Sequence, residues 1–180
     1  MWLSFISTVN AEPSVDPIEL EKREAIMPMM PSAPEGYSWK AFYGIGVLCP
    51  NTWTFTYPTG QEAGTCLNPD HPETVLTMEI FTVTGDNQSP AQLTGQFMKE
   101  ITDVDTNKVD IFNPINDERV VFRYHSDTDK YKTHKYFISD NKSKTLFVMS
   151  LKSPSDSWDS SWKVGDVVFK QVALLPWDLL

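Results

Sequence analysis

The sequence predicts an α/β fold in which one antiparallel sheet of about six strands is covered by two helices. Residues 133–151 read as two strands joined by a tight turn, and a helix is expected from Ser155 to about Leu174. A second helix is expected over residues 90–102. A hairpin followed by an amphipathic helix favours a layered arrangement, because each apolar face must be buried against another element.

Each predicted helix carries an apolar stripe. Leu93, Phe97 and Ile101 recur every four residues, and Ser89 begins that helix as part of a capping box. The stripe of the C-terminal helix is aromatic and consists of Trp158, Trp162 and Phe169. Stripes with helical spacing are more typical of a protein core than of a ligand pocket, so both helices are predicted to cover the sheet.

The predicted strands are short segments of alternating apolar and polar residues between turn-forming residues. They fall at residues 38–43, 44–49, 54–57, 65–67, 74–84, 108–113, 119–125, 131–138 and 146–151. The strands at residues 119–125 and 131–138 are expected to form a hairpin across a turn at residues 126–130.

Two parts are predicted along the chain. Residues 37–180 form the folded domain, and residues 1–36 are interpreted as a targeting remnant, a short helix at 17–25 and a Pro/Met-rich linker. Residues 1–11 hold a short apolar run that ends in a small-residue pattern typical of signal-peptide cleavage. The alternative to the targeting remnant is an ordinary N-terminus. The alternative to the linker is a Pro/Met tract that lies along a partner or along its own domain.

Charge and length restrict the classes of partner. The net charge is −9, from 24 acidic and 15 basic residues, which disfavours a nucleic-acid partner and an anionic membrane surface. A basic protein surface or a cation remains compatible with this charge. No apolar stretch approaches the ~20 residues of a transmembrane helix.

The chain has two cysteines, Cys49 and Cys66. They can form one disulfide between strands or remain two buried free thiols. The signal-like N-terminus predicts export to an oxidising compartment, whereas an intact N-terminus with free thiols at both cysteines would favour a cytosolic protein.

The sequence contains no nucleophile elbow, phosphate loop or zinc motif, so the chain is expected not to be an enzyme. The rival hypothesis is an enzyme with a dispersed acid/base pair, which would gather histidines and carboxylates in one pocket. The weak candidates for a metal site are His71 and Asp70, neighbours in a Pro-flanked loop.

The other two histidines lie on the paired strands. A turn at residues 126–130 sets His134 opposite Arg123 and His125 opposite Lys132. This register separates the two imidazole rings and puts cations near them, so both are predicted to be exposed strand residues and not metal ligands.

Four short patterns occur along the chain in an informative order. They are Tyr43-x-x-x-Val47-x-x-Pro50-x-x-Trp53, the segment KTLFVMS at residues 144–150, the pair Ser157-Trp158, and Phe169-x-x-Val172. In this order the patterns resemble the PsbP-like family, which comprises the extrinsic lumenal subunits of photosystem II and their bacterial and plastid relatives. The family has an arginine at the position of Ser157, a departure that affects any shared binding surface.

The resemblance implies a central antiparallel sheet with helices on both faces, and a role in binding and assembly. It implies a membrane-embedded protein complex as partner, which is photosystem II if the source is photosynthetic. It places the chain in a thylakoid lumen, a bacterial periplasm or the exterior. No cofactor is expected, apart from weak Ca or Mn binding that the resemblance alone suggests. The alternative is a stand-alone exported protein of the same fold that binds a small ligand or lipid.

Overall fold

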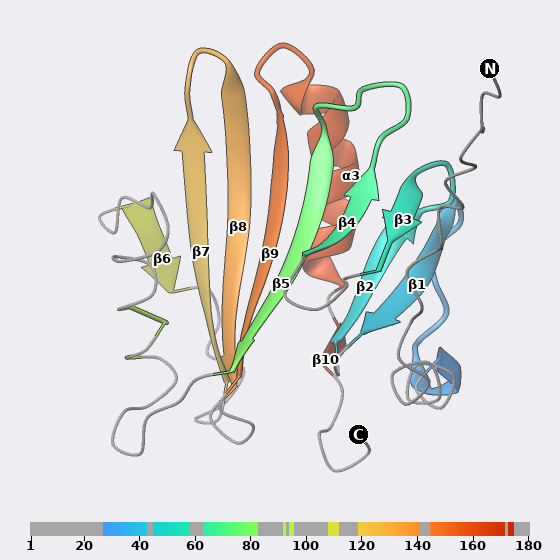
Figure 1. Cartoon of the computed structure of the whole chain (residues 1–180), viewed down its shortest axis with the longest axis vertical. Coiled ribbons are helices and arrows are strands. Elements are labelled where there is room, and N and C mark those ends of the chain that lie inside the picture. Colours follow the sequence, from blue (N-terminus) through green and yellow to red (C-terminus); the bar gives the residue numbers. More distant parts are fainter. Residues whose placement is uncertain are drawn as a thin grey trace, which may run out of the picture.

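A computed structural model describes residues 27–42, 45–57, 63–82, 92, 94, 95, 108–111, 119–140, 145–171 and 173–174. Within these residues the predicted α/β fold is confirmed, and the strands form two antiparallel sheets (Figure 1). Of the helix predicted over residues 90–102, only Gln92, Thr94 and Gly95 are described, and all three are helical. The rest of that helix and the helix predicted at 17–25 lie outside the described residues.

The larger sheet has seven strands in the described part of the chain, where the sequence predicted about six. Their order is β3-β4-β5-β9-β8-β7-β6, and every neighbouring pair is antiparallel. The strands are β3 (Thr54–Thr56), β4 (Gly64–Leu67), β5 (Val75–Thr82), β6 (Val109–Ile111), β7 (Arg119–Asp127), β8 (Tyr131–Asp140) and β9 (Thr145–Pro154).

The two faces of the larger sheet bury separate apolar clusters. Tyr136 of β8 lies opposite Met149 of β9, and both belong to the main core. The next pair, Phe137 and Val148, belongs to a second cluster. Because successive strand residues point to opposite faces, the second cluster lies on the other side of the sheet from the main core.

The smaller sheet has the order β1-β2-β10, from β1 (Tyr37–Phe42), β2 (Ile45–Pro50) and β10 (Ala173–Leu174). The prediction that the C-terminal helix continues to about Leu174 is therefore wrong at its end. Helix α3 spans Trp158–Lys170, and the Gln171 N–H bonds to the Val168 carbonyl in a tight last turn. Ala173 and Leu174 then pair with β2, so sheet hydrogen bonds replace the last predicted turn of helix.

The start of the helix also differs from the prediction. Strand β9 continues to Pro154, and residues Ser155 to Ser157 form a turn before α3 begins at Trp158. Asp156 therefore lies in the turn, and Asp159 is the acidic residue in the first helical turn. A carboxylate in that turn stabilises the helix through its dipole, and here Asp159 has this role.

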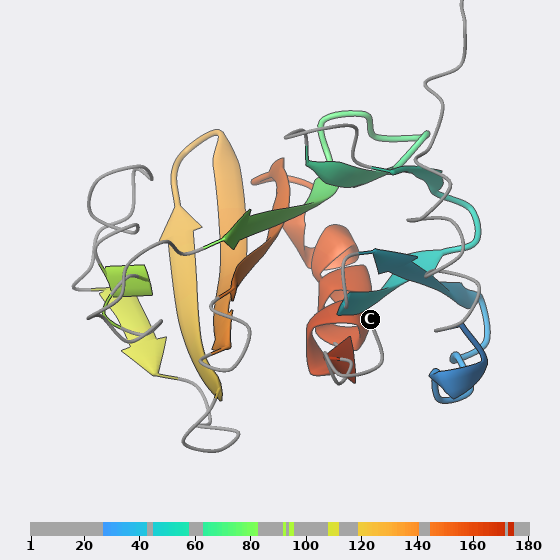
Figure 2. The same cartoon turned by 60° about the horizontal axis from the view of Figure 1, so that its bottom comes forward.

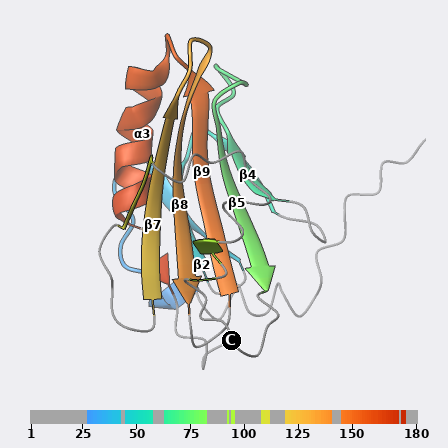
Figure 3. The ribbon, with the colours of Figure 1, turned by 90° about the vertical axis from the view of Figure 1, so that its left-hand side faces the viewer.

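Helix α3 lies between the two sheets (Figure 2). Its buried side chains join the main core with residues of β2, β5, β8 and β9. Gly165 makes the close approach to β9 possible, because a Cβ atom there would lie 2.7 Å from the Leu151 Cδ2 atom. Figure 3 shows α3 running alongside the strands of the larger sheet.

A disulfide between Cys49 of β2 and Cys66 of β4 joins the smaller sheet to the larger one. Both residues are buried, with exposures of 1% and 0%. Of the two alternatives that the sequence left open, the structure has the disulfide. Closing a loop of this sequence separation, 17 residues, stabilises the fold by about 3 kcal/mol.

The described part of the Pro/Met tract lies along its own domain. Met30 and Ala33 pack against the main core, and the Trp39 indole donates a hydrogen bond of 2.6 Å to the Pro31 carbonyl. The described part of the tract is therefore not a free linker but lies along its own domain, which was one of the alternatives. The domain boundary at residue 37 stays a prediction. Within the part of the chain described here, no helix is long and apolar enough to cross a membrane.

Candidate functional site

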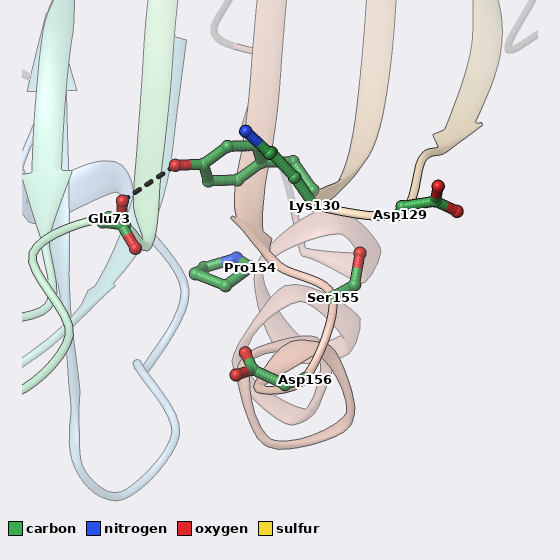
Figure 4. A pocket seen from close by; sticks show the side chains of 7 residues that line it. Glu73, Asp129, Lys130, Pro154, Ser155 and Asp156 are labelled. Atoms are coloured by element: carbon green, nitrogen blue, oxygen red, sulfur yellow. Dashed lines mark hydrogen bonds between the residues drawn. The ribbon is translucent and has the colours of Figure 1, made fainter.

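A polar hollow of about 310 Å³ opens at one end of the larger sheet (Figure 4). We call it the end pocket, and it is lined by Glu73, Asp129, Lys130, Tyr131, Pro154, Ser155 and Asp156. These residues come from three connections: the β4–β5 loop, the β7–β8 turn and the β9–α3 turn.

The topology brings the three connections together. Tyr131, at the start of β8, lies opposite Pro154, at the end of β9. Lys152 of β9 lies opposite Val75, the first residue of β5. Neighbouring antiparallel strands run in opposite directions. The starts of β5 and β8 therefore lie beside the end of β9, at the same end of the sheet.

Hydrogen bonds fix the connections relative to one another. The Tyr131 hydroxyl donates to the Glu73 carboxylate at 2.8 Å, which links the β7–β8 turn to the β4–β5 loop. The Ser155 hydroxyl donates to the Thr128 carbonyl at 2.8 Å, and the Ser155 N–H donates to the Lys130 carbonyl at 2.9 Å. The pocket walls are thus positioned before any ligand arrives, which lowers the entropy lost on binding.

A buried cluster of hydroxyl groups lies next to the pocket. The Ser153 hydroxyl is 2.9 Å from that of Thr74 and 2.8 Å from that of Ser161. Thr74 and Ser153 are fully buried and Ser161 nearly so. These bonds join the start of β5, the end of β9 and the first part of α3, which holds Glu73 and Pro154 in place.

The end pocket is negatively charged. Glu73, Asp129 and Asp156 supply three carboxylates, against the single ammonium of Lys130. The hydrogen bond to Glu73 and then its negative charge raise the pKa of Tyr131, so this phenol stays protonated and keeps donating. The Lys152 ammonium lies 4.4 Å from the centre of the Tyr131 ring, a cation–π contact that also holds the ring.

The two metal candidates lie near the pocket but do not line it. His71 and Asp70 are exposed residues of the β4–β5 loop, the loop that also supplies Glu73. The His71 carbonyl accepts the Thr74 N–H at 2.8 Å, and the Asp70 N–H bonds to Asn68 Oδ1 at 3.0 Å. In the described part of the chain, no group of three or more His, Cys, Asp or Glu could hold a metal ion. A metal at His71 and Asp70 stays a prediction.

The predicted histidine register is wrong. His125 lies directly opposite His134, with ring centres 6.0 Å apart. The reason is the turn: the ladder continues to Asp127 and Lys132, so the connecting loop is shorter than the one expected at residues 126–130. A register shift of two residues keeps both rings on one face of the sheet but brings them together.

His134 is also buried, against the prediction, whereas His125 is exposed. The His134 ring makes edge contacts with Trp162 of α3 at 4.7 Å and with Phe169 at 4.8 Å. Burial, and then the charges of His125 and Arg123, lower the pKa of His134 to about 4. A neutral imidazole among aromatic rings acts as part of the core.

Sequence reasoning missed Tyr131, Lys130 and Ser155 as pocket residues. Each lies at a turn, where local patterns predict a polar, exposed residue and nothing more. The signal that could have found them is topological. The connections before β5, before β8 and after β9 must meet once these strands are placed side by side in an antiparallel sheet.

No protein-family model and no curated protein sequence matches the chain. Among solved structures, the chain is similar to the cyanobacterial PsbP protein (CyanoP) of Synechocystis, with a TM-score of 0.54 and 15% identity over 82% of this chain and 99% of that one. The chain has the PsbP-like fold. This likeness agrees with the family resemblance seen in the sequence, and at 15% identity it concerns the fold alone.

Two further structures have lower scores. A Bacteroides thetaiotaomicron protein has a TM-score of 0.49 and 13% identity, over 75% of this chain and 46% of its own. LpqN, described as involved in cell envelope biogenesis of Mycobacterium tuberculosis, has a TM-score of 0.49 and 14% identity, over 78% of this chain and 91% of its own.

Proposed function

We propose that this chain is an exported accessory protein that binds a larger, membrane-embedded protein assembly, and that it acts by binding and not by catalysis. The observation that carries the proposal is the end pocket, which is fixed in shape and lined by three carboxylates. A negative pocket of this kind fits a basic side chain on a partner protein, because a charge-assisted hydrogen bond to a carboxylate is stronger than a neutral one.

The bonding of the pocket hydroxyls favours binding over catalysis. The Ser155 hydroxyl donates to a backbone carbonyl, and the Tyr131 hydroxyl donates to Glu73. A nucleophilic serine instead needs a base that accepts its proton. The pocket lining contains none of the three histidines, and His134 serves the core. Assays with generic ester and phosphate ester substrates are expected to give no turnover above buffer.

The disulfide supports the proposed compartment. Disulfides persist in oxidising compartments and are rare in the cytosol, and Cys49–Cys66 is buried where it joins the two sheets. The resemblance of the sequence to the PsbP-like family supports the same placement, since that family includes extrinsic lumenal subunits of photosystem II. In a photosynthetic source, we propose that the assembly is photosystem II and that the chain binds on its lumenal side. In another source, we propose a periplasmic or extracellular location.

Affinity capture from a detergent extract of the source membranes tests the proposal. The full chain is compared with a double variant, Asp129→Asn with Asp156→Asn, which removes two pocket charges and keeps the side-chain shapes. We expect the variant to recover at least about tenfold less of the partner, and added salt to weaken capture by the unchanged protein.

The matched control is Asp166→Asn. Asp166 lies on α3 outside the pocket and forms an ion pair with Lys170 at 2.7 Å. Loss of capture only in the pocket variant supports the proposal. Equal recovery by all three proteins would exclude the pocket as the binding site. No protein partner with any of them would favour the stand-alone carrier of a small ligand or lipid.

A second comparison tests the N-terminal segment. Residues 27–180 are compared with the full chain, because Met30 and Ala33 pack on the core and belong with the domain. We propose that residues 1–26 also contact the partner, so the shorter protein should be captured more weakly. Equal capture by both would restrict their role to a tether.

A further inference from the structure

A short segment at the start of the described chain lies on the smaller sheet and carries three methionines. We call residues 27–33 the Met segment, which begins with the 3₁₀ helix η1 (Met27–Met29). Met30 packs against the main core. Next to it, the Pro31 carbonyl accepts the Trp39 indole N–H at 2.6 Å. An apolar contact and a hydrogen bond therefore hold the Met segment on the domain.

The Met segment lies against one face of the smaller sheet. Trp39 lies opposite Leu48, and the next pair on the same face is Ala41 opposite Gly46. This face is buried, with Trp39 at 6% and Leu48 at 0% exposure. The other face carries Cys49, whose disulfide leads to the larger sheet. The Met segment is thus on the side of the smaller sheet that is turned away from the larger one.

The Met30 sulfur lies directly on the backbone of this face. A Cβ atom at Gly46 would lie 2.7 Å from the sulfur and 3.4 Å from the Trp39 ring, so any side chain at position 46 would displace the thioether. Gly46 is paired on both sides, with Ala41 of β1 and Ala173 of β10, and the Trp39 N–H is already bonded. The described surroundings of the sulfur therefore suit an apolar thioether, and they offer no free donor to an oxygen atom placed on it.

The methionines of the described chain differ in exposure. Met30 is half-buried, which leaves it within reach of a molecule as small as hydrogen peroxide. Met27 and Met29 are 40% and 55% exposed, whereas Met78 and Met149 are core residues at 2% and 1%. Among these described methionines, Met30 is the one that an oxidant can reach and that also holds a segment on the fold.

We propose that Met30 is a reversible oxidation site, and that its oxidation by a peroxide releases the Met segment from the smaller sheet. The sulfur attacks one oxygen of hydrogen peroxide, so that an S–O bond forms and the O–O bond breaks. The transferred OH loses its proton to the departing hydroxide, which leaves as water. The sulfur is oxidised by two electrons and the peroxide is reduced.

The product explains the release. A sulfoxide is polar, and burying it against Gly46 and the Trp39 ring without a hydrogen bond is unfavourable. The oxidised side chain gains by turning to solvent, and the Pro31 carbonyl next to it then leaves the Trp39 indole. This site is separate from the end pocket and goes beyond the proposed function.

The release has a defined limit. The Tyr37 N–H donates to the Pro34 carbonyl at 3.1 Å, and the Asn51 N–H donates to the Gly36 carbonyl at 2.8 Å. Neither bond involves Met30, so both should persist after oxidation. The Asn51 amide therefore serves as an internal reference for the integrity of the domain.

The Trp39 indole N–H reports directly on the Met segment, because its acceptor is the Pro31 carbonyl. Its hydrogen exchange is followed by NMR in the folded full chain before and after hydrogen peroxide, with peptide mass spectrometry of each methionine. Trp39→Phe assigns the signal. We expect exchange to become at least about tenfold faster once Met30 is oxidised, with no change at the Asn51 amide. Methionine sulfoxide reductases A and B should restore slow exchange.

Three variants separate Met30 from its neighbours. Met30→Leu keeps an apolar side chain that cannot form a sulfoxide, so peroxide should leave its Trp39 exchange unchanged. Met27→Leu with Met29→Leu removes the two more exposed thioethers and should respond to peroxide as the unchanged protein does. Met30→Gln places a polar group at the same position and should show fast exchange without peroxide.

Several results would overturn the proposal. One is Met30 that stays reduced while Met27 and Met29 are oxidised, and another is oxidised Met30 with unchanged Trp39 exchange. Equal acceleration in Met30→Leu would assign the effect to another residue. Faster exchange at Asn51 as well would mean unfolding of the domain and not release of the Met segment. The test uses no partner protein, so its failure and the failure of the proposed function are distinguishable.

Discussion

Protonation of His134 should destabilise the fold, and its contribution can be isolated by one substitution. His134 is 7% exposed and lies between Trp162, Phe169 and Tyr136, with ring-centre distances of 4.7, 4.8 and 5.3 Å. The groups that face it with charge are His125 and Arg123, and both disfavour a second positive charge.

The size of the effect follows from the pKa values. Burial lowers the pKa of His134 from 6.5 to about 4, and one pKa unit corresponds to 1.36 kcal/mol. The unfolded chain therefore binds the proton more tightly than the folded one. The stability that a neutral His134 contributes is fully present above pH 6.5 and is lost as the pH falls from there to about 4. The loss is about 2 kcal/mol by pH 5 and about 3 kcal/mol at the end of the window.

The assay is urea unfolding between pH 7.5 and pH 4 for the unchanged protein and for His134→Phe, which keeps an aromatic ring in place. Carboxylates titrate in both proteins, so the difference between their unfolding free energies isolates His134. We expect this difference to change by about 2 kcal/mol between pH 7.5 and pH 5. His71→Gln, at an exposed loop residue, should follow the unchanged protein. A constant difference across the pH range would refute the assignment of a buried, neutral His134.

Three further variants test the packing. Trp162→Ala should lower the free energy of unfolding in urea by about 2–3 kcal/mol. This is below the ~3–5 kcal/mol expected for a fully buried tryptophan, because the Trp162 side chain is only half-buried. A loss under about 1 kcal/mol would exclude Trp162 from the core. Replacing Cys49 and Cys66 by alanine should remove about 3 kcal/mol and lower the melting temperature in non-reducing buffer, whereas unchanged melting would mean that the disulfide does not form. Gly165→Ala should cost about 1–3 kcal/mol, since the new methyl group would overlap Leu151, and a neutral result would place α3 further from β9.

Local patterns predicted the strands and the position of α3, because strand alternation and helical spacing are properties of short segments. The aromatic stripe of Trp158, Trp162 and Phe169 is an example, since these rings contact one another and the sheet in the structure. The end of α3 was not predictable in this way. Ala173 and Leu174 leave the helix to pair with β2, a partner more than one hundred residues earlier in the chain.

The histidine pair shows a different limit. Whether His134 faces Arg123 or His125 depends on two residues of loop length at the β7–β8 turn. The composition of Thr128, Asp129 and Lys130 predicts a turn but does not fix its length. The structure closes this turn through hydrogen bonds between Thr128 and Tyr131, and that choice sets His134 opposite His125.

The end pocket could not be predicted from local sequence patterns, for a related reason. Glu73 and Tyr131 are 58 residues apart in the sequence, and neither belongs to a motif. They meet because β9 lies between β5 and β8 in the sheet, an order that the sequence pattern does not specify. Candidates chosen by residue type, such as His71 and Asp70, lie on the right loop but outside the pocket.

The central claim is that the end pocket is the surface that meets a protein partner. Its most direct measurement is photo-crosslinking in source membranes, with a photoreactive residue placed at Asp129 in the pocket or at Gln171, an exposed residue at the other end of α3. We expect a discrete adduct from position 129, mapping to a lysine- or arginine-rich segment of one partner, and none from position 171. Equal labelling from both positions, or no adduct from position 129, would contradict it.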